Sequence, residues 1–384
     1  MFGVYVHFPY CRVHCPYCDF AVAVRSRIPH AEYADAVIAE LRERAPGFAG
    51  RDLVSIYFGG GTPSLWDPAC VARVVSAICQ LFGARADDLE ITVEANPDLL
   101  PRKLLDDLRA AGVNRLSLGV QSLAPMQLVT LGRLHSAKEP IAAIADARAA
   151  GFLRVSLDLM YGLPSQSLED LARDLDGVLA LGPDHLSVYS LTIEGRTPFA
   201  VRAREGRLPL PDEDTHAAMA ELVEERIERA GLDRYEVSSW AKEGFRAVHN
   251  SLYWSGGEWL GLGSSAHSFV RLPEGGGERS ANVRGVDQYL KIALEKKYEQ
   301  WISTREALSA EDLAREAMWL GLRRIAEGVV RGDYRARYGV DPVERFAAEI
   351  ARLTGEGLLA VDAERVLLTR RGARFADEVG ARFV

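Results

Sequence analysis

Long apolar runs, abundant cysteine and an excess of basic residues are all missing from this chain of 384 residues. No stretch of 18 apolar residues occurs, and no basic segment precedes an apolar one at the start of the chain, so neither a membrane span nor a secretory signal is expected. Arginine and lysine total 46 against 54 acidic residues, a net charge of −8, which disfavours nucleic acid as the main partner. We therefore expect a cytoplasmic protein.

Only five cysteines are present, and three of them lie within eight residues. A disulfide scaffold is a poor explanation for so long a chain with so few cysteines. The spacing Cys-x3-Cys-x2-Cys leads us to interpret Cys11, Cys15 and Cys18 as metal ligands. Cys70 and Cys79 are expected to be side chains of a helix that pack into the protein core. With no fourth cysteine nearby, the pattern favours an iron–sulfur cluster with one open iron. A zinc site, which normally takes four ligands, stays the alternative.

Hydrophobic residues make up 48% of the chain, enough to bury a substantial core. Six β-rich runs, each followed by an amphipathic helical pattern, cover residues 3–8, 53–58, 89–94, 115–120, 154–159 and 185–191. Left-handed glycines are expected after four of the helices, at Gly83, Gly112, Gly151 and Gly182. Strands alternating with helices predict an α/β fold with a parallel sheet, either an open doubly wound sheet or an incomplete (β/α) barrel.

Three segments are expected along the chain. The alternating pattern occupies residues 1–195, and a less regular segment rich in tyrosine, tryptophan and glycine follows over residues 196–299. Residues 300–384 read as helix, helix and hairpin, which predicts a small winged-helix-like domain. Because the chain is acidic, this domain is interpreted as a protein-contact or lid domain rather than a DNA-binding one.

Polar residues gather where the predicted strands end. The glycine-rich stretch 59–63 follows the second strand, and the next four strands deliver Glu94, Gln121, Asp158 and Thr192. Parallel α/β folds place their active sites at the carboxyl ends of the strands, so these residues are expected to share one site with the cysteine loop. Arg133 fits either a surface charge or a bidentate clamp for a carboxylate in this site.

In this order the motifs resemble the radical S-adenosylmethionine superfamily, and within it the branch of oxygen-independent coproporphyrinogen III oxidases and haem chaperones of the HemW type. The resembling segments are the three-cysteine loop, Gly60-Gly61-Thr62-Pro63, Glu94, Gly119-Val120-Gln121-Ser122, Asp158 with Tyr161-Gly162-Leu163-Pro164, and Val188-Tyr189-Ser190-Leu191. The resemblance implies an incomplete (β/α)6 barrel. It also implies a [4Fe–4S] cluster whose open iron is chelated by the amino and carboxylate groups of S-adenosylmethionine.

The resemblance further implies roles for individual residues. The cluster ligands would be Cys11, Cys15 and Cys18, with Tyr5 beside the cofactor. The methionyl end of S-adenosylmethionine would meet Gly60, Gly61 and Thr62. Its amino, carboxylate and ribose groups would be held by Glu94, Gln121, Arg133 and Asp158, and its adenine would be lined by Thr192.

A later segment of the chain indicates which molecule the protein binds besides its cofactors. His249-Asn250-Ser251-Leu252-Tyr253-Trp254 matches a His-Asn-x-x-Tyr-Trp signature that resembles the haem-binding segment of the chaperones. Aromatic rings stack on a flat macrocycle and an imidazole binds iron axially. We therefore expect His249 to ligate haem, with His267 as the reserve candidate.

The expected function is a haem chaperone that passes haem to haem-dependent proteins, with respiratory enzymes at the membrane as implied recipients and a homodimer as a further possibility. The alternative is a radical enzyme that decarboxylates coproporphyrinogen III, and a zinc-binding structural protein is the third option. Decarboxylating relatives carry a cysteine two residues beyond the third cluster ligand, where this chain has Phe20. They also carry an extension before the first strand, which here begins almost at Met1.

Overall fold

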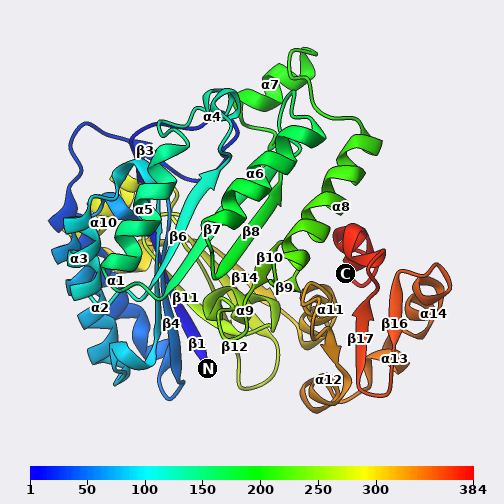
Figure 1. The fold of residues 1–384 in the computed structure, drawn as a ribbon. Helices are drawn as coiled ribbons and strands as arrows, with labels where there is room; N and C mark the ends of the chain where they lie inside the picture. The colour runs from blue at the N-terminus through cyan, green and yellow to red at the C-terminus, as the bar shows by residue number, and fades with distance from the viewer.

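The fold is built on one curved sheet of twelve strands, shown in the computed structural model of residues 1–384 (Figure 1). The structure describes every residue in that range apart from the side chain of Leu99. Within this described part of the chain, no helix is both long enough and apolar enough to cross a membrane.

Seven parallel strands form the centre of the sheet. In spatial order they are β11 (Glu258–Leu262), β1 (Phe2–Phe8), β4 (Leu53–Gly60), β5 (Glu90–Ala95), β6 (Arg115–Gln121), β7 (Arg154–Tyr161) and β8 (His185–Ser190). Side chains alternate between the two faces of a strand. In β1, Val4, Val6 and Phe8 are fully buried, whereas the rings of Tyr5 and His7 lie beside each other on the inner face.

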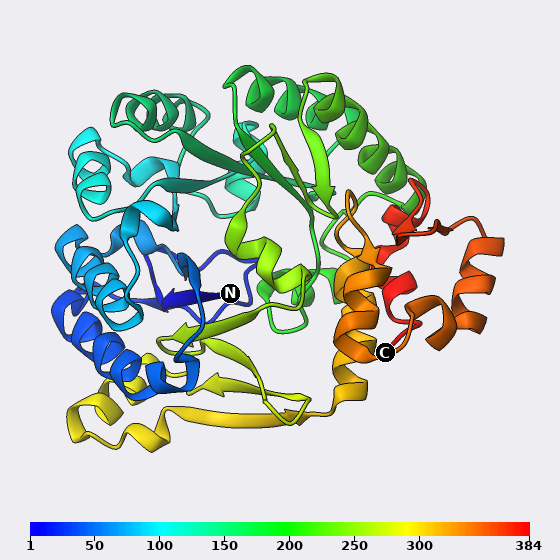
Figure 2. The ribbon, with the colours of Figure 1, turned by 90° about the horizontal axis from the view of Figure 1, so that it is seen from below.

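Helices cover the convex face of this sheet, as the view from below shows (Figure 2). They are α1 (His30–Arg44), α2 (Pro68–Phe82), α3 (Arg102–Ala110), α5 (Lys138–Ala149), α6 (Leu168–Ala180) and α8 (Glu213–Arg229). Their apolar faces join the outward side chains of the strands in one continuous core. The helix ends follow the sequence signals: Ser167 and Asp170 form a capping box at the start of α6, and Gly83 ends α2 with φ 64°.

Antiparallel strands extend the sheet at both edges. At one edge lie β10 (Ser239–Ala241) and β9 (Asp233–Glu236), and at the other lie β12 (His267–Arg271), β13 (Gly277–Asn282) and β14 (Ile302–Leu308), with α10 (Val286–Glu295) between the last two. The short helix α9 (Val248–Trp254) lies inside the curve of the sheet (Figure 2), where it contacts β1, β4 and β11.

Residues after β14 form a smaller unit with a core of its own. It contains α11 (Ala310–Leu322), β15 (Val329–Val330), α12 (Arg331–Tyr338), α13 (Pro342–Arg345), α14 (Ala347–Gly355), β16 (Leu359–Val361), β17 (Arg365–Leu368) and α15 (Ala376–Gly380). The three strands pair in the order β15-β17-β16. Met318, Tyr334, Ile350 and Val366 are buried together in this core. The order of helices and hairpin agrees with the predicted winged-helix-like arrangement.

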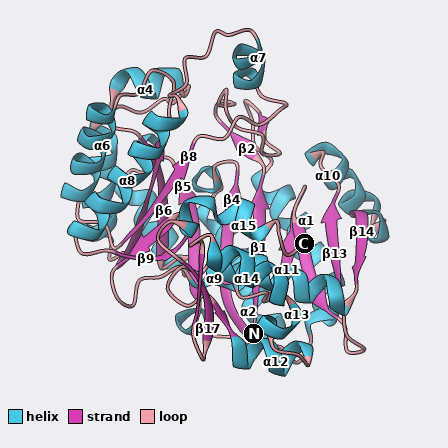
Figure 3. Ribbon diagram, turned by 90° about the vertical axis from the view of Figure 1, so that its right-hand side faces the viewer, coloured by secondary structure: helices cyan, strands magenta, loops and turns pink.

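The connections at the two ends of the sheet differ. The loop that holds β2 (Tyr10–Cys11) and β3 (Ala23–Val24), together with α4 (Pro125–Thr130) and α7 (Pro198–Arg204), lies at the carboxyl ends of the parallel strands (Figure 3). The amino terminus and the C-terminal unit lie toward the opposite end (Figures 1 and 3). The cysteine loop is therefore at the end where a parallel sheet places its site.

The six predicted parallel strands and the left-handed glycines Gly83, Gly112, Gly151 and Gly182 are confirmed. The sequence pattern missed the seventh strand, β11, and the antiparallel strands beside it. These strands come from the segment that was expected to be less regular. The main sheet also continues through β14 to Leu308, beyond residue 299, where the predicted middle segment ends.

A buried carboxylate fastens the antiparallel extension to the rest of the sheet. Glu40 of α1 is fully buried, and it accepts hydrogen bonds from the backbone N–H of Gly263 at 2.9 Å, the amide of Asn282 at 2.6 Å and the hydroxyl of Tyr289 at 2.7 Å. It also pairs with Arg44 at 2.9 Å. These donors come from the loop after β11, from β13 and from α10, so one side chain joins three segments to α1.

We expect Glu40→Leu to lower the free energy of unfolding by about 3–5 kcal/mol, the usual cost of removing one partner from a buried ion pair. Glu43→Leu, at an exposed position on the same helix, serves as the matched control and should change it by less than about 0.5 kcal/mol. Chemical denaturation followed by circular dichroism measures both. Equal effects of the two substitutions would contradict the role given to Glu40.

Candidate functional site

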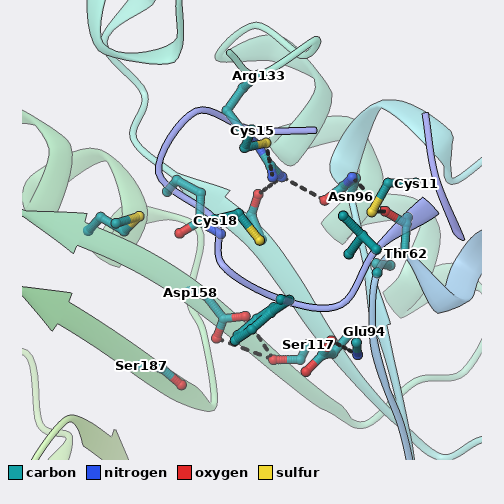
Figure 4. A pocket seen from close by; sticks show the side chains of 18 of the residues that line it. Cys11, Cys15, Cys18, Thr62, Glu94, Asn96, Ser117, Arg133, Asp158 and Ser187 are labelled. Atoms are coloured by element: carbon teal, nitrogen blue, oxygen red, sulfur yellow. Dashed lines mark hydrogen bonds between the residues drawn. The ribbon is translucent and has the colours of Figure 1, made fainter. Parts of the chain in front are cut away.

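A cavity of about 370 Å³ opens at the carboxyl ends of the parallel strands. Its wall contains most of the residues predicted from the sequence: Cys11, Cys15, Cys18, Gly60, Gly61, Thr62, Glu94, Gln121, Arg133 and Asp158. Figure 4 shows the three cysteine side chains on one side of this cavity and the two carboxylates deeper between the strands. The structure thus gathers predicted residues that are up to 147 positions apart in the chain, since Cys11 and Asp158 both line this cavity.

The pairing of the parallel strands sets the depth of the two carboxylates. Glu94 of β5 lies opposite Ser117 of β6, and the Ser117 hydroxyl donates to Asp158 at 3.0 Å. Glu94 accepts one hydrogen bond from the hydroxyl of Tyr57 at 2.7 Å and another from the backbone N–H of Gly60 at 3.1 Å. Both carboxylates are therefore held by neighbours on the adjoining strands.

Burial governs the charge of both carboxylates, although the charges of Arg115 and Arg133 partly offset its effect on Asp158. Burial is the main cause that raises the pKa of Glu94 to about 7, and the nearby charge of Asp158 adds to it. Burial also raises the pKa of Asp158 to about 6, against the opposing effect of its bond from Ser117. A cationic or amino-bearing ligand would stabilise the ionised form of both groups.

The cysteine loop runs between β2 and β3 across the mouth of the cavity. The Thr62 hydroxyl donates to Cys11 Sγ at 3.5 Å, and Arg133 Nη1 lies 4.0 Å from Cys15 Sγ. Burial is the main cause that raises the pKa of the Cys11 thiol to about 11 and shifts that of Cys18 in the same direction. These thiols have no reason to ionise at neutral pH unless a metal takes the place of the proton.

The number of thiolates bears on the choice of metal. A closed zinc site normally takes four ligands. In a [4Fe–4S] cluster, three thiolates bind three of the irons and leave the fourth iron open. Cys11, Cys15 and Cys18 are all free thiols, and this set of three donors has the chemistry that such a cluster requires.

Arg133 has two neutral partners that orient its guanidinium over the cavity. Its Nη2 donates to Asn96 Oδ1 at 2.6 Å and to the backbone carbonyl of Gly119 at 2.7 Å. A Cβ atom at Gly119 would lie 3.0 Å from Gln121 Nε2 and 3.2 Å from Arg133 Nη2, so the absence of a side chain there lets both groups approach. Gln121 ends β6 with φ 64°, a conformation uncommon for residues other than glycine.

Two predicted cofactor residues lie outside the cavity wall. Tyr5 is on the inner face of β1, with its ring centroid 6.1 Å from that of Tyr57 and its hydroxyl 3.1 Å from His7 Nδ1. Thr192 follows β8 and is exposed. The sequence motifs missed Tyr57, Asn96 and Ser117, although period-two alternation within the strands places Asn96 and Glu94 on one face.

His249 lies beneath this site, on α9. It is 1% exposed, and both ring nitrogens have partners: Nδ1 lies 2.9 Å from Ser55 Oγ, and Nε2 lies 2.9 Å from the Tyr253 hydroxyl. Its ring stacks on Tyr57 with centroids 5.1 Å apart. Burial lowers the pKa of His249 to about 3, so the imidazole is neutral. His267, in contrast, begins β12 and is exposed.

Comparison with known proteins agrees with this geometry. The family model of the radical SAM superfamily matches residues 5–177, and the model of the HemN C-terminal domain matches residues 308–375. The heme chaperone HemW of Bacillus subtilis (strain 168) is 35% identical over 384 residues, which cover 100% of this chain and 99% of that protein. The chain belongs to the HemW family of radical SAM proteins.

Two further relatives place the HemW family in context. The mitochondrial radical S-adenosyl methionine domain-containing protein 1 of Mus musculus is 36% identical over 94% of this chain and 82% of its own. Among solved structures, coproporphyrinogen III oxidase (HemN) of Escherichia coli, a radical SAM enzyme, matches with a TM-score of 0.83 and 25% identity, over 100% of this chain and 89% of the enzyme. The radical SAM barrel and its C-terminal domain are thereby confirmed.

The raised pKa of Glu94 predicts how cofactor binding depends on pH. The ionised carboxylate accepts charge-assisted hydrogen bonds from an amino group, whereas the protonated form is neutral and accepts more weakly. Affinity for S-adenosylmethionine should therefore fall as the pH drops below about 7. Between pH 8 and pH 6 the loss should be roughly tenfold. Isothermal titration calorimetry of the cluster-loaded protein at both pH values measures this affinity. Glu94→Gln should bind more weakly at pH 8 with a flatter pH profile, and an unchanged profile would show that Glu94 does not contact the ligand.

Proposed function

We propose that this protein is a haem chaperone that binds haem, carries a [4Fe–4S] cluster and S-adenosylmethionine, and delivers haem to haem-dependent proteins. The similarity over the whole length to a heme chaperone HemW carries this proposal. The His249–Trp254 signature supports it, because it supplies an imidazole and aromatic rings suited to a metal macrocycle. We further propose a cytoplasmic location, respiratory enzymes among the recipients, and a homodimer as an assembly state.

The chain's own residues have distinct tasks in this proposal. Cys11, Cys15 and Cys18 would hold the cluster, which supplies an iron with an open position when it is bound. Arg133 would bind the carboxylate of S-adenosylmethionine, and Glu94 would accept from its amino group. Asp158 would accept from the ribose hydroxyls, with Gly60, Gly61, Thr62 and Gln121 around the methionyl end, Tyr5 beside it and Thr192 toward the adenine.

The second candidate is a radical enzyme that decarboxylates coproporphyrinogen III. The observation that favours it is the likeness to the Escherichia coli oxidase, which extends over the whole of this chain. Against it stands Phe20, whose side chain is 66% exposed at the position where decarboxylating relatives carry a cysteine. Both candidates use the same cofactor cavity, so the cavity does not distinguish them.

Anaerobic reconstitution distinguishes these functions. We expect iron and acid-labile sulfide without stoichiometric zinc, and we expect stable haem binding with transfer to a haem-free acceptor. No protoporphyrinogen IX should form from coproporphyrinogen III in the presence of reductant and S-adenosylmethionine. Replacement of Cys11, Cys15 and Cys18 by serine should abolish the cluster, whereas Cys79→Ser, on α2 outside the cavity, should retain it.

Each alternative function predicts a different result in that experiment. Sustained decarboxylation would replace the chaperone by the oxidase. One tightly bound zinc without iron would support the structural zinc protein instead.

Both ring nitrogens of His249 already have hydrogen-bond partners. For His249 to bind iron, one of its two contacts must be exchanged for the metal. The contact with Tyr253 is the one to exchange, since Tyr253 lies on the same short helix and is less buried than Ser55. We therefore propose iron ligation through His249 Nε2, with Tyr253 displaced. His267 remains the alternative ligand, since its imidazole is exposed.

Tyr253→Phe distinguishes the two histidines. It removes the competing hydroxyl from His249 Nε2 without a large change in shape, so haem affinity should rise roughly two- to tenfold, the equivalent of one hydrogen bond. His249→Ala should weaken haem binding and shift the Soret band, and His267→Ala should do neither. Haem titrations followed by absorbance measure all three. If His267→Ala loses haem while Tyr253→Phe has no effect, the ligand is His267.

A further inference from the structure

Asn96 occupies a junction between the cysteine loop and Arg133. Its Oδ1 accepts from Arg133 Nη2 at 2.6 Å, and its Nδ2 donates to Thr62 Oγ1 at 3.3 Å. The Thr62 hydroxyl in turn donates to Cys11 Sγ at 3.5 Å. The four side chains form a continuous chain of hydrogen bonds at one side of the cavity (Figure 4).

The chemistry of the groups at its two ends fixes the direction of this series of hydrogen bonds. A guanidinium only donates, so the oxygen of the Asn96 amide must face Arg133 and its NH₂ must face Thr62. Thr62 therefore accepts from Asn96 and has its own proton free for the sulfur of Cys11. Hydrogen bonds aligned in one direction polarise one another, so the positive charge of Arg133 strengthens the donation to Cys11.

The backbone holds Asn96 in the conformation that this series of hydrogen bonds requires. Pro97 follows directly and starts a short 3₁₀ turn, Pro97–Leu99. A residue before proline is restricted to extended conformations, and Asn96 has φ −95° and ψ 138°. It therefore continues the alternation of β5 and stands on the same face as Glu94, two residues earlier. The order Glu-x-Asn-Pro thus delivers two different groups to one cavity.

We propose that Asn96 is a positioning residue that couples the carboxylate-binding Arg133 to the cluster ligand Cys11. It holds the guanidinium in place for the carboxylate of S-adenosylmethionine, and through Thr62 it supports a hydrogen bond to the Cys11 thiolate. Donors to a cluster thiolate raise the reduction potential of the cluster. This inference rests on the proposed cluster and cofactor, and it adds a residue that sets both the affinity and the potential.

Two variants separate these effects. Asn96→Ala removes both bonds, so we expect about tenfold weaker binding of S-adenosylmethionine. We also expect the midpoint potential of the cluster to be about 59 mV lower, which corresponds to a tenfold change in the equilibrium constant for its one-electron reduction. Thr62→Val removes the donor to Cys11 and the acceptor for Asn96 Nδ2, but it leaves the bond between Asn96 and Arg133. It should lower the potential by a similar amount with a smaller loss of affinity. In the double variant the two shifts in potential should not add, because both changes break the same chain.

The measurements are calorimetric titration with S-adenosylmethionine and a redox titration followed by electron paramagnetic resonance, both on protein of measured iron content. Gln80→Ala is the control: it removes a side-chain amide from an exposed position on α2, outside the cavity, and should leave both the affinity and the potential unchanged. If the Asn96→Ala protein loses its iron, the Asn96→Asp variant is measured in its place. Asn96→Asp keeps the acceptor for Arg133 but loses the donor to Thr62, so its potential should fall while the cluster is retained.

The outcomes distinguish this inference from the proposed function. A wild-type protein without a four-iron cluster would overturn both. A wild-type cluster together with unchanged affinity and potential in Asn96→Ala, or additive shifts in the double variant, would overturn only the role of Asn96.

Discussion

The parallel register of β4 to β8 is the constraint on which the rest of the structure depends. In each strand, alternate side chains face outward into the helices and inward into the curve of the sheet. The outward set is apolar and forms one continuous core, so a slip by one residue would turn this set into the cavity. The same register sets Glu94 beside Ser117, and Asp158 beside Ser187. The hydrophobic core thereby fixes the geometry of the polar site, and Ala95 belongs to the core and also lines the cavity.

Much of this arrangement follows from the sequence alone. Period-two strands and glycine-terminated helices predict the six parallel strands, and the carboxyl ends of such strands predict that the cysteine loop, Glu94 and Asp158 share one cavity. These inferences succeed because they depend on local patterns and on one general rule of parallel sheets.

The parts that escaped prediction depend on contacts between distant segments. β11 pairs with β1 across more than 250 residues, and no local pattern records that choice. Tyr57 and Ser117 face the cavity because of strand register, and they look like ordinary strand residues in the sequence. The burial of His249 is a further example. Its motif predicted a haem ligand and said nothing of burial, but α9 packs inside the sheet, and a Cβ at Gly3 would lie only 2.9 Å from the His249 ring. The lack of a side chain at position 3 makes this packing possible.

That packing connects the haem signature to the cofactor cavity. Tyr57 stacks on His249 on one side and donates to Glu94 on the other, so a single ring lies between the two. Asn250, the next residue of the signature, forms part of the cavity floor. Any movement of α9 that frees His249 must therefore change the surroundings of Tyr57, and with them the hydrogen bonding of Glu94. The cofactor cavity and the His249–Trp254 segment are thus parts of one packed interior, joined by the ring of Tyr57.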